Sequence, residues 1–225
     1  MNTIKNLPHY DILIATPGHS MSAGYVKSLM ATVKELNALG ITYEFLTGYS
    51  SLVHNAREIT MGNDPQLNPD DTGPLHNGCT YNKMIWIDSD IEWSVSDFLV
   101  IYYSKYDIVS GAYLLANGTD SCVVTKEGVT LTKIHIKQGA IAEPFVVQSV
   151  GFGFIAIMSG VFERIPRPWF GLLQQEIYNS RGEQLYISIG EDISWTIKAQ
   201  QLGYEVYFDP RVLVTHLKTV QVTWT

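Results

Sequence analysis

Two aspartates one residue apart, Asp88 and Asp90, are the side chains whose spacing points most directly to chemistry. They follow the unbroken apolar run Met84–Ile87, which predicts a strand buried on both faces, as in a parallel sheet covered by helices. Ligands of open α/β sheets bind beyond the carboxyl ends of the strands, so both carboxylates should reach a ligand site. Two carboxylates this close repel each other, and a hard divalent cation that bridges to phosphate relieves the repulsion. The alternative interpretation is an Asp-rich turn after a strand.

A second acidic pair, Glu191 and Asp192, stands directly before a helical pattern that ends at Gly203. A helix N-terminus favours acidic side chains through its free N–H groups and its dipole, so capping alone accounts for one of the two. The same N-terminus is expected to keep Asp192 deprotonated, as a general base must be.

Three further side chains admit both a structural and a functional interpretation. His216 ends an apolar strand pattern, where it either is a satisfied structural histidine or completes an oxygen-rich metal site. Arg57, inside a predicted helix, either pairs with a phosphate or lies at the surface. Trp169, between Pro168 and Phe170, either walls a sugar site or fills the core.

Gly151 and Gly153 match the letters of a dinucleotide-binding fingerprint, but that motif must follow a strand and open a helix. Here the glycines precede the strand-like run 154–158, so we reject the fingerprint. Glycines at these positions are expected to let the backbone approach a ligand or a neighbouring strand.

The elements needed to position these residues alternate between strand and helix along the first half, which predicts a doubly wound α/β sheet. The second half predicts a mixed extension of the same sheet, with an antiparallel hairpin and a turn at Pro210. The loop 63–77 is predicted to be a mobile lid. Predicted strands cover 11–16, 41–47, 84–87, 106–113, 122–125, 129–132, 154–158, 205–209 and 212–216, and predicted helices cover 23–39, 51–61, 95–104 and 193–202.

Composition bounds the class of protein. The 225 residues contain 46% hydrophobic and 16% charged residues, which suits one globular domain, 1–225, rather than a disordered chain. The net charge of −7 and the lack of a basic cluster argue against nucleic acid as a partner. Two cysteines form no metal or disulfide pattern. With no signal-like start and no apolar run long enough to span a bilayer, a cytoplasmic location is expected.

The order of these parts resembles the GT-A fold nucleotide-sugar glycosyltransferases, most closely the small family-2-like enzymes of bacteria, phages and large viruses. The resemblance covers nearly the whole chain, with a nucleotide-binding half at 1–113 and an acceptor-side half at 114–225. The motifs that carry it are DILIATP, SLVHNAREIT, IWIDSDIEW, SVGFGFIAIMSGVFERI followed by PRPWF, and GEDISWTIKAQQLGYEVYFDPRVLVTH. One departure is the long segment 63–77 between the arginine helix and the Asp-X-Asp strand.

The resemblance implies a role for each matching residue. It implies a Mn²⁺ or Mg²⁺ ion held by Asp88, Asp90 and His216, and an inverting reaction in which Asp192 is the general base. Residues implied on the donor side are Thr16, Pro17, Arg57, Asp88, Ser89 and Asp90. Residues implied on the acceptor side are Gly151, Phe152, Gly153, Trp169 and Glu191.

The function expected from the sequence is transfer of a sugar from a UDP- or GDP-linked donor to a hydroxyl of a glycan or another acceptor. A sugar-1-phosphate nucleotidyltransferase would need a basic, Gly-rich loop after the first strand, and the loop 17–22 has no Lys or Arg. An aspartyl-phosphate phosphatase would carry its Asp-X-Asp after the first strand instead of a later one. A catalytically silent sugar-nucleotide or glycan-binding module would lack one of Asp88, Asp90 or Asp192, and all three are present.

Overall fold

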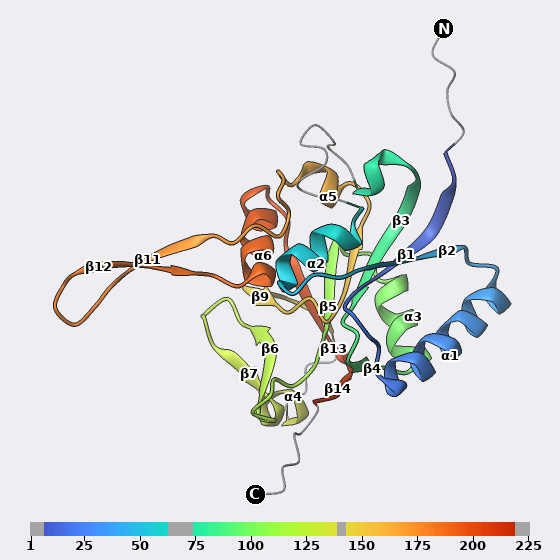
Figure 1. The fold of residues 1–225 in the computed structure, drawn as a ribbon. Coiled ribbons are helices and arrows are strands. Elements are labelled where there is room, and N and C mark those ends of the chain that lie inside the picture. Colours follow the sequence, from blue (N-terminus) through green and yellow to red (C-terminus); the bar gives the residue numbers. More distant parts are fainter. Residues whose placement is uncertain (1–6, 63–73, 139–142, 219–225) are drawn as a thin grey trace, which may run out of the picture.

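A seven-stranded mixed sheet forms the centre of the computed structural model, which describes residues 7–62, 74–138 and 143–218. Its strands are β1 (His9–Pro17), β2 (Tyr43–Gly48), β3 (Thr80–Ile87), β5 (Ile108–Ala112), β8 (Phe145–Val147), β10 (Phe154–Met158) and β13 (Val206–Leu213). They lie in the order β2-β1-β3-β10-β5-β13-β8 (Figure 1). Strands β1, β2 and β3 are mutually parallel, and so are β5 and β13.

Strand β10 lies between β3 and β5 and is antiparallel to both. The two halves of the sequence, 1–113 and 114–225, therefore contribute interleaved strands to one sheet. The predicted α/β class with a mixed sheet is confirmed.

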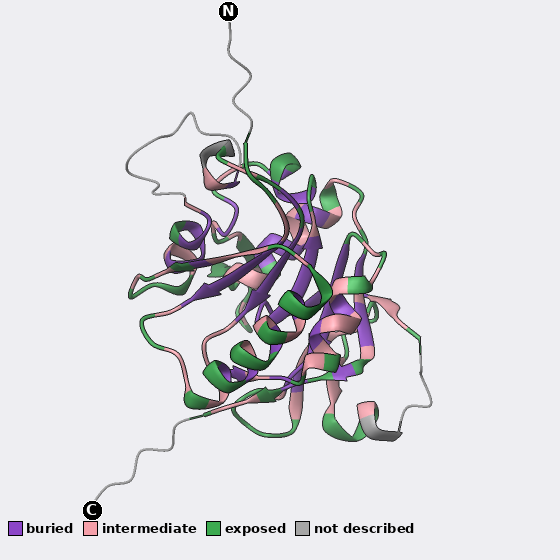
Figure 2. Cartoon of the chain, turned by 90° about the vertical axis from the view of Figure 1, so that its right-hand side faces the viewer, coloured by how far each residue is buried: buried purple, intermediate pink, exposed green. Residues whose placement is uncertain are grey.

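Helices cover both faces of this sheet, and Figure 2 shows the buried strands between them. One core cluster packs α1 (Ala23–Leu39) and α3 (Val95–Tyr103) against the sheet. The other cluster includes side chains of α5 (Val161–Arg164) and α6 (Glu191–Gln201), next to which α2 (Val53–Thr60) ends at the buried Met61.

Strand β3 shows why the sequence lacks polar alternation there. Met84 and Trp86 face one core cluster, whereas Ile85 and Ile87 face the other, and all four are fully buried. A strand covered on both faces must be apolar at every position. Asp88 is therefore the first residue able to leave the apolar interior, as the sequence predicts.

Helix α1 has the predicted bounds because both of its ends carry strong local signals. The Ser22 hydroxyl accepts a hydrogen bond from the Tyr25 amide at 3.0 Å, which caps the N-terminus. Gly40 ends the helix with φ of 70°, a left-handed conformation that glycine adopts without steric cost.

The turn predicted at Pro210 is wrong. Strand β13 continues from Val206 to Leu213, and the register of its pairing with β5 shifts between Phe208 and Leu213. Proline has no N–H to donate to a sheet ladder, so an irregular register is the way a strand accommodates it. The chain then forms β14 (Thr215–His216), which pairs antiparallel with β4 (Ile91–Glu92).

Smaller elements lie at the edges of the sheet. The predicted hairpin is confirmed as β6 (Asp120–Val124) and β7 (Thr130–Thr132), which β9 (Ser149–Val150) joins. A short helix, α4 (Lys133–Gln138), follows it. Within the predicted lid 63–77, residues 63–73 lie outside the described residues and Pro74–Asn77 form a 3₁₀ turn.

A second hairpin was not predicted. Its strands β11 (Gln174–Tyr178) and β12 (Gln184–Ser188) pair only with each other in the described part of the chain, and Figure 1 shows them projecting from the body. Most of their side chains are exposed on both faces, so no hydrophobic period marks them in the sequence.

Candidate active site

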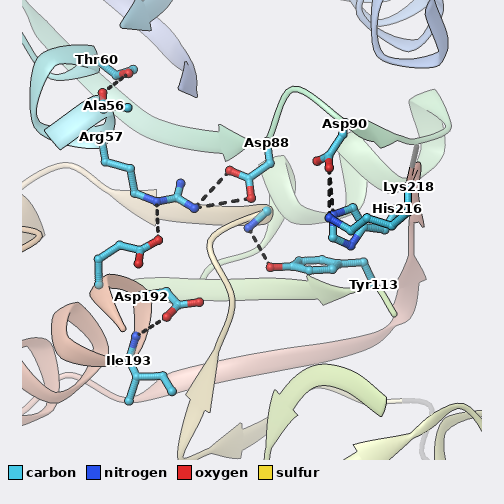
Figure 3. Close-up of polar contacts among 12 residues, drawn as sticks. Ala56, Arg57, Thr60, Asp88, Asp90, Tyr113, Asp192, Ile193, His216 and Lys218 are labelled. Atoms are coloured by element: carbon cyan, nitrogen blue, oxygen red, sulfur yellow. Dashed lines mark hydrogen bonds and ion pairs between the residues drawn. The ribbon is translucent and has the colours of Figure 1, made fainter. Parts of the chain in front are cut away.

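Asp88 and Asp90 lie in a tight turn directly after β3. The Asp88 amide donates to the Gly153 carbonyl at 3.0 Å, and the Asp88 carbonyl accepts from the Ile91 amide at 3.0 Å. The two carboxylates diverge toward different cationic partners, Arg57 on one side and the His216–Lys218 segment on the other (Figure 3).

Strand pairing brings His216 to Asp90. In the β4–β14 ladder His216 is opposite Ile91, and the His216 Nε2 lies 3.1 Å from Asp90 Oδ2. The Lys218 ammonium donates to the same oxygen at 3.2 Å. Burial opposes ionisation of Asp90, but the hydrogen bonds from His216 and Lys218 prevail and lower its pKa.

The protonation state of His216 bears on whether a cation fits between its ring and the Asp90 carboxylate. Its Nδ1 lies 2.9 Å from the Leu114 carbonyl, which can only accept, so Nδ1 carries a proton. In the neutral ring Nε2 would then be an acceptor facing a carboxylate oxygen. The pair needs a second ring proton or a metal ion in that place, and the hydrogen bond to Asp90 raises the pKa of His216 accordingly.

Asp88 is engaged by Arg57, which lies neither at the surface nor in an open phosphate site. Arg57 is 3% exposed, and its Nη2 lies 3.1 Å from Asp88 Oδ1. Among the described residues, no three or more His, Cys, Asp or Glu side chains are gathered to hold a metal ion. Asp88, Asp90 and His216 have the oxygen and nitrogen atoms that bind a divalent ion. In this structure His216 and Lys218 occupy Asp90 Oδ2, and both Asp88 oxygens face Arg57 Nη2, at 3.1 and 3.4 Å.

The acids at the start of α6 have separate surroundings. Glu191 Oε1 accepts from Arg57 Nε at 3.3 Å, while Asp192 Oδ1 accepts from the Ile193 amide at 2.8 Å. The Ile193 amide at the helix N-terminus favours the charged form of Asp192, as expected, but it is not the largest influence on the pKa of this group. Burial, followed by the charge of Glu191, raises the pKa of Asp192, and these effects outweigh the Ile193 amide and Arg57.

Tyr113, which follows β5, explains the glycines at 151 and 153. A Cβ on Gly151 would lie 2.1 Å from the Tyr113 hydroxyl oxygen, and one on Gly153 would lie 2.6 Å from its ring. The tyrosine ring is also 5.0 Å from the His216 ring. Both glycines therefore make room for a close neighbour, but that neighbour is the Tyr113 side chain and not the ligand or strand expected from the sequence.

Sequence reasoning missed Tyr113 and Lys218 as neighbours of the site. One signal was available for Lys218, because it lies two residues beyond His216 in an extended segment and so shares its side. Tyr113 carries no comparable signal, since an aromatic residue at a strand end is common in any core.

Several predicted ligand-contacting side chains are buried. Phe152 and Trp169 are fully buried, and the Trp169 indole donates to the Phe162 carbonyl at 2.9 Å. The sugar-wall interpretation of Trp169 gives way to the core interpretation. Thr16 is also fully buried, and its hydroxyl hydrogen-bonds to the Tyr25 hydroxyl. Pro17 is buried at the end of β1, whereas Ser89 is half-buried and lies against Gly18 on the same edge.

A cavity of about 280 Å³ adjoins His216, with Tyr113, Leu114 and Thr215 among its walls. None of Asp88, Asp90, Asp192 and His216 lines this cavity, so it lies beside the candidate site and not within it.

Comparison with known proteins bears on the fold. No protein-family model matches this sequence, and no curated protein matches it. Among solved structures, A197 from STIV superimposes with a TM-score of 0.50 at 17% identity, over 97% of this chain and 98% of that one. GalNAc-T7, solved with UDP, GalNAc and Mn²⁺, superimposes with a TM-score of 0.53 at 10% identity, over 96% of this chain and 44% of that one. The chain has the GT-A fold of the glycosyltransferases.

Proposed function

We propose that this protein is a metal-dependent glycosyltransferase, which moves a sugar from a UDP- or GDP-linked donor to an acceptor hydroxyl. The observation that carries the proposal is the junction of Asp90 with His216 beside Asp88, at the carboxyl end of β3. This is the edge at which open α/β sheets bind ligands. The Mn²⁺ bound by GalNAc-T7, which shares the fold, is consistent with a divalent ion here.

Asp88, Asp90 and His216 would hold the ion, with one carboxylate oxygen of Asp88 keeping its contact with Arg57. When bound, the ion would neutralise the charge of the departing nucleoside diphosphate. Ser89 lies along the same edge and would contact the donor, with the buried Thr16 and Pro17 supporting it from inside.

Asp192 would accept the proton of the acceptor hydroxyl, which gives an inverting reaction. Its raised pKa favours this task, because a base is most effective when its pKa approaches the working pH. The paired Glu191 is engaged with Arg57 and is less available for proton transfer.

Incubation with Mn²⁺ and a panel of sugar nucleotides tests the proposal. We expect slow release of nucleoside diphosphate from one donor, which names the sugar and the nucleotide together, and none after chelation of the metal. Binding of a sugar nucleotide without turnover, in the presence of candidate acceptors, would instead establish the silent binding module.

A further inference from the structure

The guanidinium of Arg57 lies in a box of aromatic rings. Its Cζ is 5.3 Å from the Phe152 ring, 5.8 Å from the Trp86 ring and 5.9 Å from the Phe170 ring. A buried guanidinium loses its hydration, and cation–π contacts replace only part of that interaction. The charge therefore requires carboxylates at close range.

Two carboxylates from distant parts of the chain meet this need. Asp88 follows strand β3 and contacts Nη2 at 3.1 Å, whereas Glu191 opens helix α6 and contacts Nε at 3.3 Å. One side chain on α2 thus joins the turn after β3 to the first residue of α6 (Figure 3).

The bridge separates the roles of the adjacent acids. Glu191 is drawn to Arg57, and only 13% of its side chain is exposed. Asp192 next to it is held by the Ile193 amide of its own helix. Because Glu191 and Asp192 share one backbone turn, fixing the first also fixes where the second is presented.

We propose that Arg57 is a positioning residue, which ties Glu191 to Asp88 and so sets Asp192 relative to the carboxylates after β3. The inference rests on the proposed function only in treating Asp192 as the base. It differs from the direct donor contact expected for Arg57 from sequence, because Nε and Nη2 of the guanidinium already donate to carboxylates. The remaining nitrogen, Nη1, is buried and has no hydrogen-bond partner among the described residues.

The kinetic test uses Arg57→Lys, which keeps the charge and loses the fork, and Glu191→Gln, which keeps the shape and loses the charge. We expect each variant to retain its affinity for Mn²⁺ and nucleoside diphosphate but to lower kcat by about 10²-fold, since small displacements of reacting groups have effects of this size. The double variant should lose little more activity than either single variant, because both substitutions break the same Arg57–Glu191 contact. Arg164→Lys, an exposed arginine on α5, is the matched control and should behave as wild type.

Loss of nucleotide affinity in Arg57→Lys with kcat retained would overturn the inference in favour of direct donor contact. Unchanged kinetics in both variants would overturn it in favour of packing alone. Restoration of turnover in Arg57→Ala by added methylguanidinium would support it further.

A measurement without turnover separates this inference from the proposed function. In wild type and Glu191→Gln, the amide NMR resonances of Asp88 and Ser89 report on the far side of the bridge. We expect them to shift in Glu191→Gln and to stay in place in the control variant Glu183→Gln, on the exposed hairpin tip. Unmoved resonances would refute the bridge, whereas an inactive wild type with shifted resonances would refute only the glycosyltransferase proposal.

Discussion

At the scale of single residues, the aspartates after β3 differ in their partners and share an expected role. Asp88→Asn and Asp90→Asn should each abolish metal-dependent nucleotide binding, because an amide oxygen attracts a hard divalent ion much less than a carboxylate does. Both side chains are at least partly exposed, at 26% and 39%, so the fold should survive. Calorimetric titration of nucleoside diphosphate with and without Mn²⁺ measures the effect.

The exposed Asp107 provides the matched control for these two variants, since Asp107→Asn removes a carboxylate away from the turn after β3. Metal-dependent affinity equal to wild type in both Asp88→Asn and Asp90→Asn would exclude this turn as the metal site.

Asp192→Asn tests the general base. The substitution keeps size and removes basicity, so transfer should fall by roughly 10²–10⁴-fold while nucleotide affinity stays. Proton NMR of the product should show an inverted anomeric centre. A product that keeps the donor's configuration would make Asp192 an acceptor-binding or charge-stabilising residue of a retaining enzyme.

The raised pKa of Asp192 predicts the acid limb of the pH profile. Transfer requires the deprotonated carboxylate, so kcat should fall as pH decreases through a value above the ordinary 3.8. The same shift has an opposite sign for stability. Between the folded-state pKa and 3.8 the native state binds more protons than the unfolded state, so this group adds stability as pH falls. A kcat profile without a raised acid limb would contradict the assignment.

At the scale of elements, the projecting hairpin β11–β12 should be dispensable for folding. Neither core cluster contains a residue of the hairpin, and Gln174 faces Ser188 at its base. Joining these two residues through Asn-Gly, a two-residue turn suited to hairpins, should leave the melting temperature within about 2–4 °C of wild type. A larger loss, measured by circular dichroism, would mean that the hairpin packs on the body.

Element pairing also controls the metal side of the site. The two-residue strands β4 and β14 are short, yet their ladder determines that His216 meets Asp90. The Leu217 amide reinforces it by donating to the Asp90 carbonyl at 2.8 Å. The metal side of the candidate site therefore depends on the pairing of β4 with β14, which lies outside the seven-stranded sheet.

At the scale of the whole molecule, ligand binding should appear as stability. A ligand that binds only the folded state, present at a concentration of 100 times its Kd, stabilises that state by about 2.7 kcal/mol. Mn²⁺ with nucleoside diphosphate should therefore raise the melting temperature. His216→Ala should reduce this rise less than Asp90→Asn does, because a neutral nitrogen attracts a hard cation less than a carboxylate. A rise in His216→Ala equal to wild type would make His216 structural.

Described residues contain no helix long and apolar enough to cross a membrane. The seven-stranded sheet belongs to the whole molecule, since its adjacent strands β3, β10 and β5 come from both halves of the sequence.

The sequence by itself determined the elements with strong local signals. The Met84–Ile87 run, the Ser22 cap and Gly40 identify β3 and α1, and they place Asp88 and Asp90 at a strand end, because burial and capping depend on nearby residues. Sequence-based prediction failed where the local pattern is ambiguous. It placed a turn at Pro210, which lies within strand β13.

Only the tertiary structure decided which side chains meet. Arg57 and Glu191 are 134 residues apart, and Asp90 and His216 are 126 apart. Hydrophobic periodicity tells which face of an element is buried, but it does not encode what lies opposite that face. Arg57 therefore read as a surface or phosphate-binding residue and Trp169 as a possible sugar wall, whereas the packing of α2, β3 and α6 encloses both in the core.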